Sequence, residues 1–335
     1  MKDGILSAIG HTPLVSLRRI FKETSFRLYA KLEGCNPGGS VKDRAALSIL
    51  RRAIEAGEIN RDTVVIESSS GNMGIGLAQA CAYFGLRFIC VVDPKATSQN
   101  IDIMRAYGAE VDLVTIPDAR SGEFLQARIQ RVQTLARSIS NSFWPNQYGN
   151  LYNPIAHHQT MREIATELEG KVDLLICATS TCGTLRGCAE YLKRNRLKSR
   201  IIAVDAIGSV IFGGQQGKRL IPGHGAAVRP PLCQSELADD IVYVSDLECI
   251  VGCRTLVQKE GILAGGSSGA AVMAVSKYMD RIPAGANCVM IFPDRGERYL
   301  NTIYSDAWVV EHFGSVPALL EDVTPTWLSK RLGAD

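Results

Sequence analysis

Residues 63–80 read TVVIESSSGNMGIGLAQA, and this stretch contains a strand, a turn and the start of a helix in succession. The apolar, β-branched run 63–67 has the composition of a buried strand. Small and hydroxyl-bearing residues follow it, and residues 74–84 then have the pattern of a helix. A strand that leads through a glycine-rich turn into a helix is the building block of a parallel α/β sheet.

The same alternation continues along the chain. Further strands are expected at 28–32, 87–92, 110–114, 174–178, 201–204, 241–244 and 288–292. Helices are expected at 42–56, 99–107, 122–138 and 153–168, with another that starts near Gly269. We therefore predict an α/β protein whose sheets are mostly parallel and doubly wound, with helices on both faces.

A chain of 335 residues is longer than a single hydrophobic core usually supports, so two lobes are expected. Residues 140–154 are rich in Asn, Pro and Gly, which indicates a crossing between them. We predict a smaller, mobile lobe at 40–145 and a larger lobe that combines 1–39 with 146–312. Residues 313–335 have weak periodicity and are treated as a C-terminal tail.

Composition excludes several classes of function. The net charge is +3 and no apolar run has the length of a membrane span, so neither a nucleic-acid nor a membrane partner is expected. The basic residues between 193 and 200 are interpreted as the solvated end of a helix. The ten cysteines lack paired CxxC spacing and fit free thiols in a reducing cytoplasm. His157 and His158 have no evident third ligand, so no metal site is expected.

Three turns rich in glycine and hydroxyl groups, at 68–76, 179–184 and 265–269, lie where helices should begin. A helix N-terminus stabilises anions such as phosphate or carboxylate, although each turn taken alone is equally compatible with ordinary chain reversal. The first turn has the spacing GxxGxG instead of GxGxxG, and Pro94 follows Asp93 where an acidic ribose ligand would stand. A nicotinamide dehydrogenase is therefore disfavoured.

Residues 36–44 read NPGGSVKDR and place Lys42 on the first turn of a helix, with Ser40 as the expected N-cap. The helix dipole there disfavours the protonated amine, and a readily deprotonated lysine is what Schiff-base chemistry requires. An ordinary surface lysine between Asp43 and Arg44 explains the residues equally well.

The segment NPGGSVKDR resembles the cofactor-lysine segment of the cysteine synthase and cystathionine β-synthase family, which comprises fold-type II pyridoxal-phosphate enzymes with a fold like that of the tryptophan synthase β subunit. Residues 9–15 (IGHTPLV), 70–78 (SGNMGIGLA), 260–270 (EGILAGGSSGA) and 296–300 (GERYL) resemble further motifs of that family, in the same order.

The resemblance implies the role of each matching residue. Lys42 is similar to the lysine that binds pyridoxal phosphate and moves the substrate Cα proton, and Asn72 to the side chain that contacts the ring hydroxyl. The loop that binds the cofactor phosphate is implied at Ser180, Thr181, Cys182, Gly183 and Thr184. Ser267 is similar to the neutral group at the pyridine nitrogen, which favours β-replacement over transamination. The substrate α-carboxylate would be held by Ser69, Ser70, Gly71 and Gln147.

Four departures from ordinary cysteine synthases concern the substrate. Met73 replaces a threonine, Cys182 stands in a loop that is usually richer in glycine, Tyr148 replaces a phenylalanine, and residues 293–296 read PDRG. Core packing is an alternative explanation for Met73 and Cys182.

Residues 207–213, 293–296 and 304–308 together resemble the branch that makes N-(2-amino-2-carboxyethyl)-L-glutamate for 2,3-diaminopropionate in siderophore biosynthesis. That branch joins O-phospho-L-serine to L-glutamate by β-replacement and is expected to be a cytoplasmic homodimeric transferase. Arg128, Tyr148 and Ser180 are the candidates for the second substrate or the leaving phosphate, and an exposed helix arginine is the alternative for Arg128.

Cysteine synthase, acting on O-acetylserine or O-phosphoserine with sulfide, remains an alternative because it shares every cofactor residue. A cystathionine β-synthase is disfavoured by the lack of room for haem and regulatory segments. A non-catalytic protein that keeps this fold is disfavoured because Lys42, Asn72 and Ser267 are all present.

Overall fold

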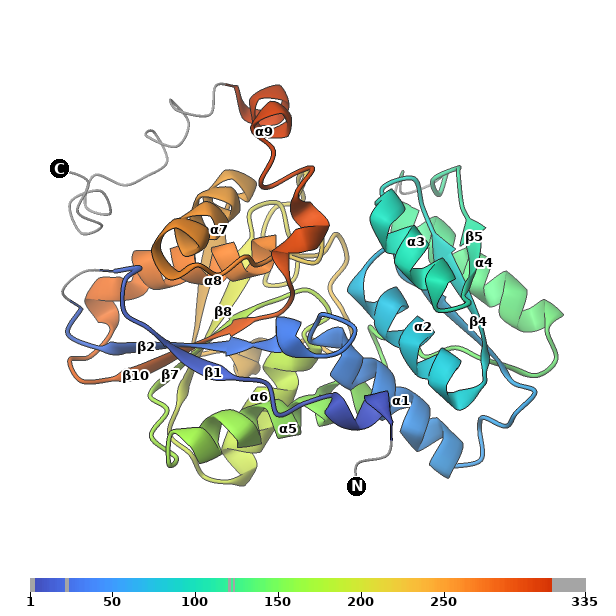
Figure 1. The fold of residues 1–335 in the computed structure, drawn as a ribbon, viewed down its shortest axis with the longest axis horizontal. Helices are drawn as coiled ribbons and strands as arrows, with labels where there is room; N and C mark the ends of the chain where they lie inside the picture. The colour runs from blue at the N-terminus through green and yellow to red at the C-terminus, as the bar shows by residue number, and fades with distance from the viewer. Residues whose placement is uncertain (1–3, 22–23, 120–121, 123, 315–335) are drawn as a thin grey trace. The chain divides into compact units, whose positions relative to one another are not determined.

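The structure is a computed structural model that describes residues 4–21, 24–119, 122 and 124–314 (Figure 1). The chain divides into two units, one made of Met1–Gly10 with Asn36–Ala156 and the other of His11–Cys35 with His157–Asp335. Of the tail expected at 313–335, residues 315–335 lie outside the described part.

The first unit is built on a four-stranded sheet in the order β5-β4-β3-β6, and all its strand pairs are parallel. The strands are β3 (Val64–Ser68), β4 (Arg87–Val92), β5 (Glu110–Leu113) and β6 (Ser142–Phe143). The helices of this unit are α1 (Lys42–Glu55), α2 (Asn72–Phe84), α3 (Ser98–Ala106) and α4 (Phe124–Ser138), after the short 3-10 helix η1 (Ile5–Ala8).

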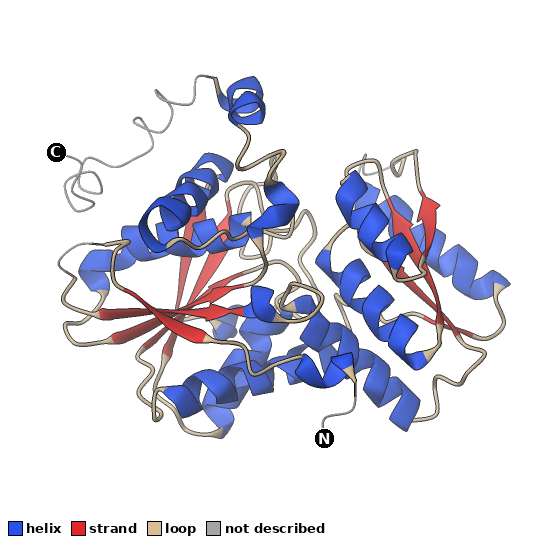
Figure 2. Ribbon diagram, in the orientation of Figure 1, coloured by secondary structure: helices blue, strands red, loops and turns tan. Residues whose placement is uncertain are grey.

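Alternate residues of β3 and β4 face opposite sides of this sheet. Val65 and Cys90 belong to the core that includes α1, α2 and α3. Ile66 and Val91 instead pack with Val132 of α4. The sheet is therefore covered by helices on both faces, as the sequence predicted (Figure 2).

The second unit contains a six-stranded sheet in the order β1-β2-β10-β7-β8-β9. Its strands are β1 (Leu14–Leu17), β2 (Arg27–Leu32), β7 (Leu174–Ala178), β8 (Arg200–Ala206), β9 (Asp240–Val244) and β10 (Asn287–Phe292). Only the pairing of β1 with β2 is antiparallel among the described strands.

Helices cover both faces of this sheet as well. The helices are α5 (Tyr152–Glu167), which begins in the first unit, then α6 (Gly183–Arg194), α7 (Asp246–Glu260), α8 (Gly266–Tyr278) and α9 (Asp306–Phe313). Leu174 and Ile176 pack with α7 and α8, whereas Leu175 and Cys177 pack with α5 and α6. The doubly wound α/β prediction is confirmed for both units.

Two glycines bring α7 and α8 into backbone contact. A Cβ added at Gly252 would lie 2.2 Å from the carbonyl oxygen of Gly269, and one added at Gly269 would lie 2.0 Å from that of Cys249. This close packing fixes the position of α8, whose first turn contains Ser267.

Every strand predicted from the sequence is present within a residue or two, and the predicted helices are present as well. The helix expected near Gly269 begins at Gly266. Strands β1 and β6 and helices α7 and α9 were not predicted. In the segment 140–154 the structure contains β6 and the start of α5, and the chain passes from one unit to the other between Ala156 and His157, inside α5.

The basic residues and the cysteines of the sequence occupy different environments in the structure. Lys193 and Arg194 end α6 and are exposed, which confirms the solvated helix end. All ten cysteines are free, and nine are buried. Within the described ranges, no group of acidic, histidine or cysteine side chains is arranged to hold a metal ion. None of the described helices has both the length and the apolar character that a membrane span needs.

Candidate active site

Lys42 is the first residue of α1 and is half-buried. The glycine turn before it is held by Asp43, whose carboxylate accepts the backbone N–H of Gly38 at 2.6 Å. The N-cap is Val41, so the prediction that Ser40 is the N-cap was wrong. The buried Ser40 hydroxyl nevertheless accepts the backbone N–H of Lys42 at 3.2 Å and so fixes the start of the helix.

The glycines of the motif at 70–78 allow close packing around this lysine. A Cβ at Gly76 would lie 3.3 Å from the carbonyl oxygen of Lys42, so α2 contacts the first turn of α1. A Cβ at Gly74 would lie 2.6 Å from the sulfur of Met104 and 3.1 Å from the carbonyl oxygen of Ser69. Close packing therefore explains Gly74 and Gly76 of the GxxGxG motif, and a bound dinucleotide is not needed to explain them.

The loop between β3 and α2 is held in place by hydrogen bonds. Ser69 Oγ accepts the N–H of Gly74 at 2.9 Å. The Ser70 carbonyl accepts from Asn100 Nδ2 at 3.2 Å, and Gln147 Nε2 donates to the Ser68 carbonyl at 3.3 Å. Asn72 opens α2 directly after this loop. The residues proposed for the substrate carboxylate are thus fixed relative to the helix that carries Asn72.

Arg128 is half-buried beside the same loop. Its side chain is 12% exposed, and its Nε lies 3.0 Å from a carboxylate oxygen of Asp93, which is 4% exposed. Its Nη1 donates to the Ser70 hydroxyl at 3.0 Å. The alternative interpretation of Arg128 as an exposed helix arginine is therefore wrong.

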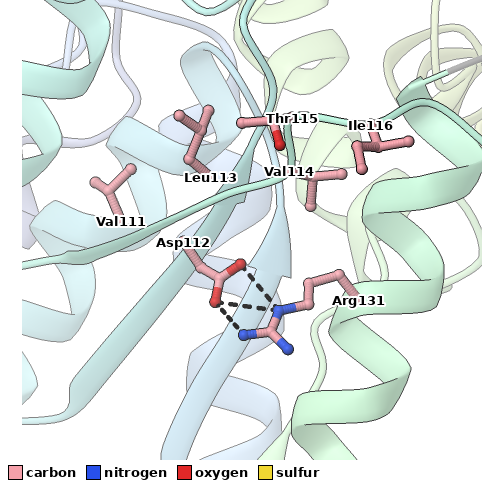
Figure 3. A pocket seen from close by; sticks show the side chains of 7 residues that line it. All are labelled: Val111, Asp112, Leu113, Val114, Thr115, Ile116 and Arg131. Carbon is pink, nitrogen blue, oxygen red and sulfur yellow. Dashed lines mark hydrogen bonds and ion pairs between the residues drawn. The ribbon is translucent and has the colours of Figure 1, made fainter.

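The neighbouring Arg131 is the residue that lies at the surface. It is 43% exposed and pairs with Asp112 at 2.7 Å. Both belong to a shallow depression of about 500 Å³ lined by residues 111–116 and Arg131 (Figure 3). None of the predicted site residues lines this depression.

Glu67 is a buried carboxylate that the sequence motifs did not indicate. Burial raises its pKa to about 7, although hydrogen bonds from the Ser68 N–H, the Trp144 indole and the Gln147 N–H oppose the shift. Its two oxygens connect the end of β3 to the segment that carries Gln147 and Tyr148. The sequence signal that could have indicated Glu67 is the presence of a charged residue at the end of an apolar strand.

The segment with Gln147 and Tyr148 is further fixed by Asn153, whose side-chain amide donates to the Gln147 carbonyl at 2.7 Å. Gln147 is buried and Tyr148 is half-buried. Met73, by contrast, is 2% exposed and packs in the hydrophobic core of the first unit. Core packing therefore explains the burial of Met73.

In the second unit, residues 180–184 comprise the end of the turn after β7 and the first two residues of α6. Cys182 is the N-cap of α6 and has a positive φ of 63°, and the Thr181 hydroxyl accepts the Gly183 N–H at 3.3 Å. Thr184 Oγ1 lies 3.3 Å from Nε2 of the buried His157, whose Nδ1 lies 3.2 Å from the Thr160 hydroxyl. The turn therefore combines hydroxyl groups with a helix N-terminus, which suits a phosphate group.

Ser267 is the second residue of α8 and is 7% exposed. Its hydroxyl forms no hydrogen bond with any residue that the structure describes, which leaves a nearly buried donor and acceptor for a ligand. Asp294, the acidic residue of the PDRG segment at 293–296, lies at the same helix terminus, because a Cβ at Gly265 would lie 2.0 Å from Asp294 Oδ1. The Tyr299 hydroxyl donates to the other oxygen of Asp294 at 2.5 Å.

These two sets of residues fit pyridoxal phosphate. The first unit contains Lys42 and Asn72 with the fixed serine loop, and the second unit contains the phosphate-type turn and Ser267. An amine, a helix terminus that suits an anion and a hydroxyl without a protein partner are the kinds of group that this cofactor requires.

Known proteins agree with this chemistry. The chain matches the family "Pyridoxal-phosphate dependent enzyme" over residues 5–294. It is 44% identical over 306 residues to the N-(2-amino-2-carboxyethyl)-L-glutamate synthase of Ralstonia nicotianae, covering 91% of this chain and 90% of the relative. It is 43% identical over 312 residues to the protein of the same name from Cupriavidus metallidurans, covering 92% and 91%.

A solved structure shares both the fold and part of the sequence. The O-acetylserine dependent cystathionine β-synthase from Helicobacter pylori superimposes with a TM-score of 0.83 at 36% identity, covering 90% of this chain and 98% of that chain. The chain thus belongs to the family of pyridoxal-phosphate dependent enzymes, in its cysteine synthase-like group, and its cofactor is pyridoxal phosphate.

Proposed function

We propose that this enzyme is an N-(2-amino-2-carboxyethyl)-L-glutamate synthase, which joins O-phospho-L-serine and L-glutamate by β-replacement and releases phosphate. The observation that carries the proposal is the identity of 43–44% with two relatives of that name over nine-tenths of the chain. The product would be a precursor of 2,3-diaminopropionate for siderophore biosynthesis.

Pyridoxal phosphate, when bound, supplies the electron sink that makes loss of the β-substituent and its replacement feasible. We assign to Lys42 the attachment of the cofactor and the transfer of the Cα proton. Its place in the first turn of α1 supports this assignment, since the helix N-terminus disfavours the charged amine.

The first unit offers donors for the α-carboxylate of the substrate. Ser69, Ser70, Gly71 and Gln147 are proposed to hold it, with Asn72 directed at the ring hydroxyl of the cofactor. The hydrogen bonds that fix this loop support the assignment, because a preorganised site loses little entropy when substrate binds. Met73 is proposed to act there through packing.

The second unit offers groups for the cofactor itself. Ser180, Thr181, Cys182, Gly183 and Thr184 are proposed to hold its phosphate, and Ser267 its pyridine nitrogen. A neutral hydroxyl at that nitrogen suits β-replacement. The lack of a protein partner for the Ser267 hydroxyl among the described residues supports this role.

Two anionic substrates require positive charge near the site. Arg128, Tyr148 and Ser180 are proposed to act on the leaving phosphate or on glutamate. The hydrogen bond from Arg128 to the Ser70 hydroxyl supports the assignment of Arg128, because it brings a half-buried guanidinium to the loop assigned to carboxylate binding.

We further propose that the enzyme is a cytoplasmic homodimer and that its smaller lobe, 40–145, moves when substrate binds. Ten free cysteines suit a reducing compartment. Closure of a lobe would exclude water from the reaction.

Cysteine synthase is the second candidate. The similar structure from Helicobacter pylori is that of an O-acetylserine dependent cystathionine β-synthase, so this fold is compatible with another donor and another nucleophile. The two functions differ in which amino-acid donor and which nucleophile the enzyme accepts.

The test uses the purified holoenzyme with O-phospho-L-serine or O-acetyl-L-serine, each combined with L-glutamate or sulfide, and identifies products by mass spectrometry. The proposal predicts the secondary-amine product from phosphoserine and glutamate, together with one phosphate per product. Formation of cysteine alone would assign the enzyme to the cysteine synthases. Lys42→Ala serves as the control for uncatalysed reaction.

A further inference from the structure

Cys182 occupies an unusual backbone position in the proposed phosphate turn. It is the N-cap of α6, its φ is 63°, and its side chain is 3% exposed. A positive φ is uncommon for a residue other than glycine, so the turn is sensitive to any force on this side chain.

Cys233 is the second member of a thiol pair. It lies on a turn in which its N–H donates to the Pro230 carbonyl at 2.9 Å. Cys182 and Cys233 belong to one small hydrophobic cluster with Ile211 and Ala226, although they lie 51 positions apart in the chain. The Cys233 thiol donates to the backbone carbonyl of Ile211, another member of this cluster, at 3.8 Å.

The two thiols have opposite acidities. The neighbouring Cys182 thiol lowers the pKa of Cys233 to about 7, and the Arg229 guanidinium contributes to the shift, while burial opposes it. The same interaction and burial raise the pKa of Cys182. Near neutral pH, Cys233 therefore supplies a thiolate beside a protonated thiol, which is the arrangement that favours disulfide formation.

Other thiols of the chain lack these features. Burial raises the pKa of Cys81, Cys90, Cys249, Cys253 and Cys288, which makes their thiols poor nucleophiles. Cys35 is the exposed cysteine of the chain and lies in the short helix η2 (Glu33–Cys35).

We propose that Cys182 and Cys233 form a redox modification site. A peroxide closes a reversible disulfide there, which links the proposed phosphate turn to the turn that contains Cys233. The Cys233 thiolate attacks one peroxide oxygen, the O–O bond breaks, and a sulfenic acid and hydroxide result. The Cys182 thiol then attacks the sulfenic sulfur and releases water. In total, two thiols lose two electrons and two protons, and hydrogen peroxide becomes two molecules of water.

The disulfide acts on cofactor binding. Two sulfur atoms in a disulfide lie about 2 Å apart, closer than any two sulfur atoms that are not bonded, so closure pulls on the N-cap of α6. The N–H groups at that helix terminus are the proposed phosphate donors. Oxidation is therefore expected to weaken the affinity for pyridoxal phosphate, and reduction restores it. This consequence depends on the assignment of the phosphate turn and not on the identity of either substrate.

The test treats the cofactor-depleted and cofactor-loaded enzyme with hydrogen peroxide and maps peptides without reduction. The expected result is a linked peptide that joins Cys182 to Cys233, with a severalfold loss of affinity for pyridoxal phosphate that dithiothreitol reverses. Cys233→Ser should prevent both effects, whereas Cys35→Ser should leave both unchanged. Thermal unfolding of each variant verifies that it is folded.

Two outcomes would overturn the inference. One is the absence of the linked peptide in folded wild-type enzyme, and the other is a linked peptide that leaves cofactor affinity unchanged. The linked peptide and the cofactor affinity are both measured without phosphoserine, glutamate or sulfide. Their outcome therefore does not depend on whether the proposed reaction is correct.

Discussion

Arg128 Nη1 donates a hydrogen bond to the Ser70 hydroxyl at 3.0 Å, while Arg128 Nε lies 3.0 Å from the buried carboxylate of Asp93. A residue of α4 thus holds the loop that follows β3, and Asp93, which follows β4, balances its charge. This relationship connects three segments of the first unit around the proposed carboxylate site.

Replacing Arg128 with alanine should lower both activity and stability. The change leaves the Asp93 carboxylate buried without its guanidinium, and breaking a buried pair costs about 3–5 kcal/mol. We expect kcat/KM for O-phospho-L-serine to fall more than tenfold, measured by phosphate release, because Ser70 loses its donor. Arg131→Ala is the matched control, since its exposed pair with Asp112 contributes about 1 kcal/mol or less. Equal effects of the two substitutions would contradict this account.

Glu67 should make stability depend on pH in a defined direction. Its pKa is raised from 4.5 to about 7 in the folded state, chiefly by burial. Between these values the folded state binds more protons than the unfolded state, so this contribution to stability falls as pH rises. The shift corresponds to about 3 kcal/mol.

The measurement is the difference in unfolding free energy between wild type and Glu67→Gln at pH 5 and pH 8. Wild type should lose stability relative to the variant as pH rises. Glu110→Gln is the control, because Glu110 is exposed and Arg87 lowers its pKa, so its effect should not change across this range. A difference for Glu67→Gln that is constant with pH would refute the assignment.

Gly252→Ala should destabilise the protein although alanine is the better helix former. In an open helix the substitution would gain about 1 kcal/mol. Here the new Cβ would lie 2.2 Å from the Gly269 carbonyl oxygen, so α7 and α8 must separate, at a cost of about 3 kcal/mol. Chemical denaturation measures the change. Gly71→Ala is the control for stability alone, since its new Cβ has no neighbour closer than 4.0 Å and its φ is −152°.

Ser267→Ala should weaken retention of the cofactor with little effect on the stability of the cofactor-free protein. The Ser267 hydroxyl has no partner among the described residues, so its removal breaks no internal hydrogen bond. Dialysis followed by visible absorbance measures retention. Ser276→Ala, in the same helix, removes another buried hydroxyl without a hydrogen-bond partner and should retain the cofactor fully. Equal retention by both variants would exclude Ser267 from the cofactor site.

The periodic parts of the fold were predictable because local sequence determines them. The apolar run at 63–67 and the glycine turn after it specify β3 and α2 without knowledge of the rest of the chain. Strand β6 has only two residues, Ser142 and Phe143, and exists through its pairing with β3, so no local pattern indicates it. Helix α7 packs closely on α8 through Gly252, and a contact made by a glycine adds nothing to an apolar stripe. The sequence pattern therefore did not predict this helix.

The site was predicted unevenly for the same reason. The motif around Lys42 and the serine loop are contiguous in sequence, and their resemblance to a family is specific. Glu67 became evident only when the fold buried it, and the surface interpretation of Arg128 was excluded by its contact with Asp93. The cluster that contains Cys182 and Cys233 joins distant parts of the second unit, so no sequence spacing indicates it.

The most direct test of the central claim is a competition in which the holoenzyme receives O-phospho-L-serine with equal concentrations of L-glutamate and sulfide. The ratio of N-(2-amino-2-carboxyethyl)-L-glutamate to cysteine is then measured by mass spectrometry at early times. We predict that the glutamate product predominates and that Arg128→Ala lowers its rate. Predominance of cysteine, or faster turnover with O-acetyl-L-serine in place of phosphoserine, would contradict the proposed function.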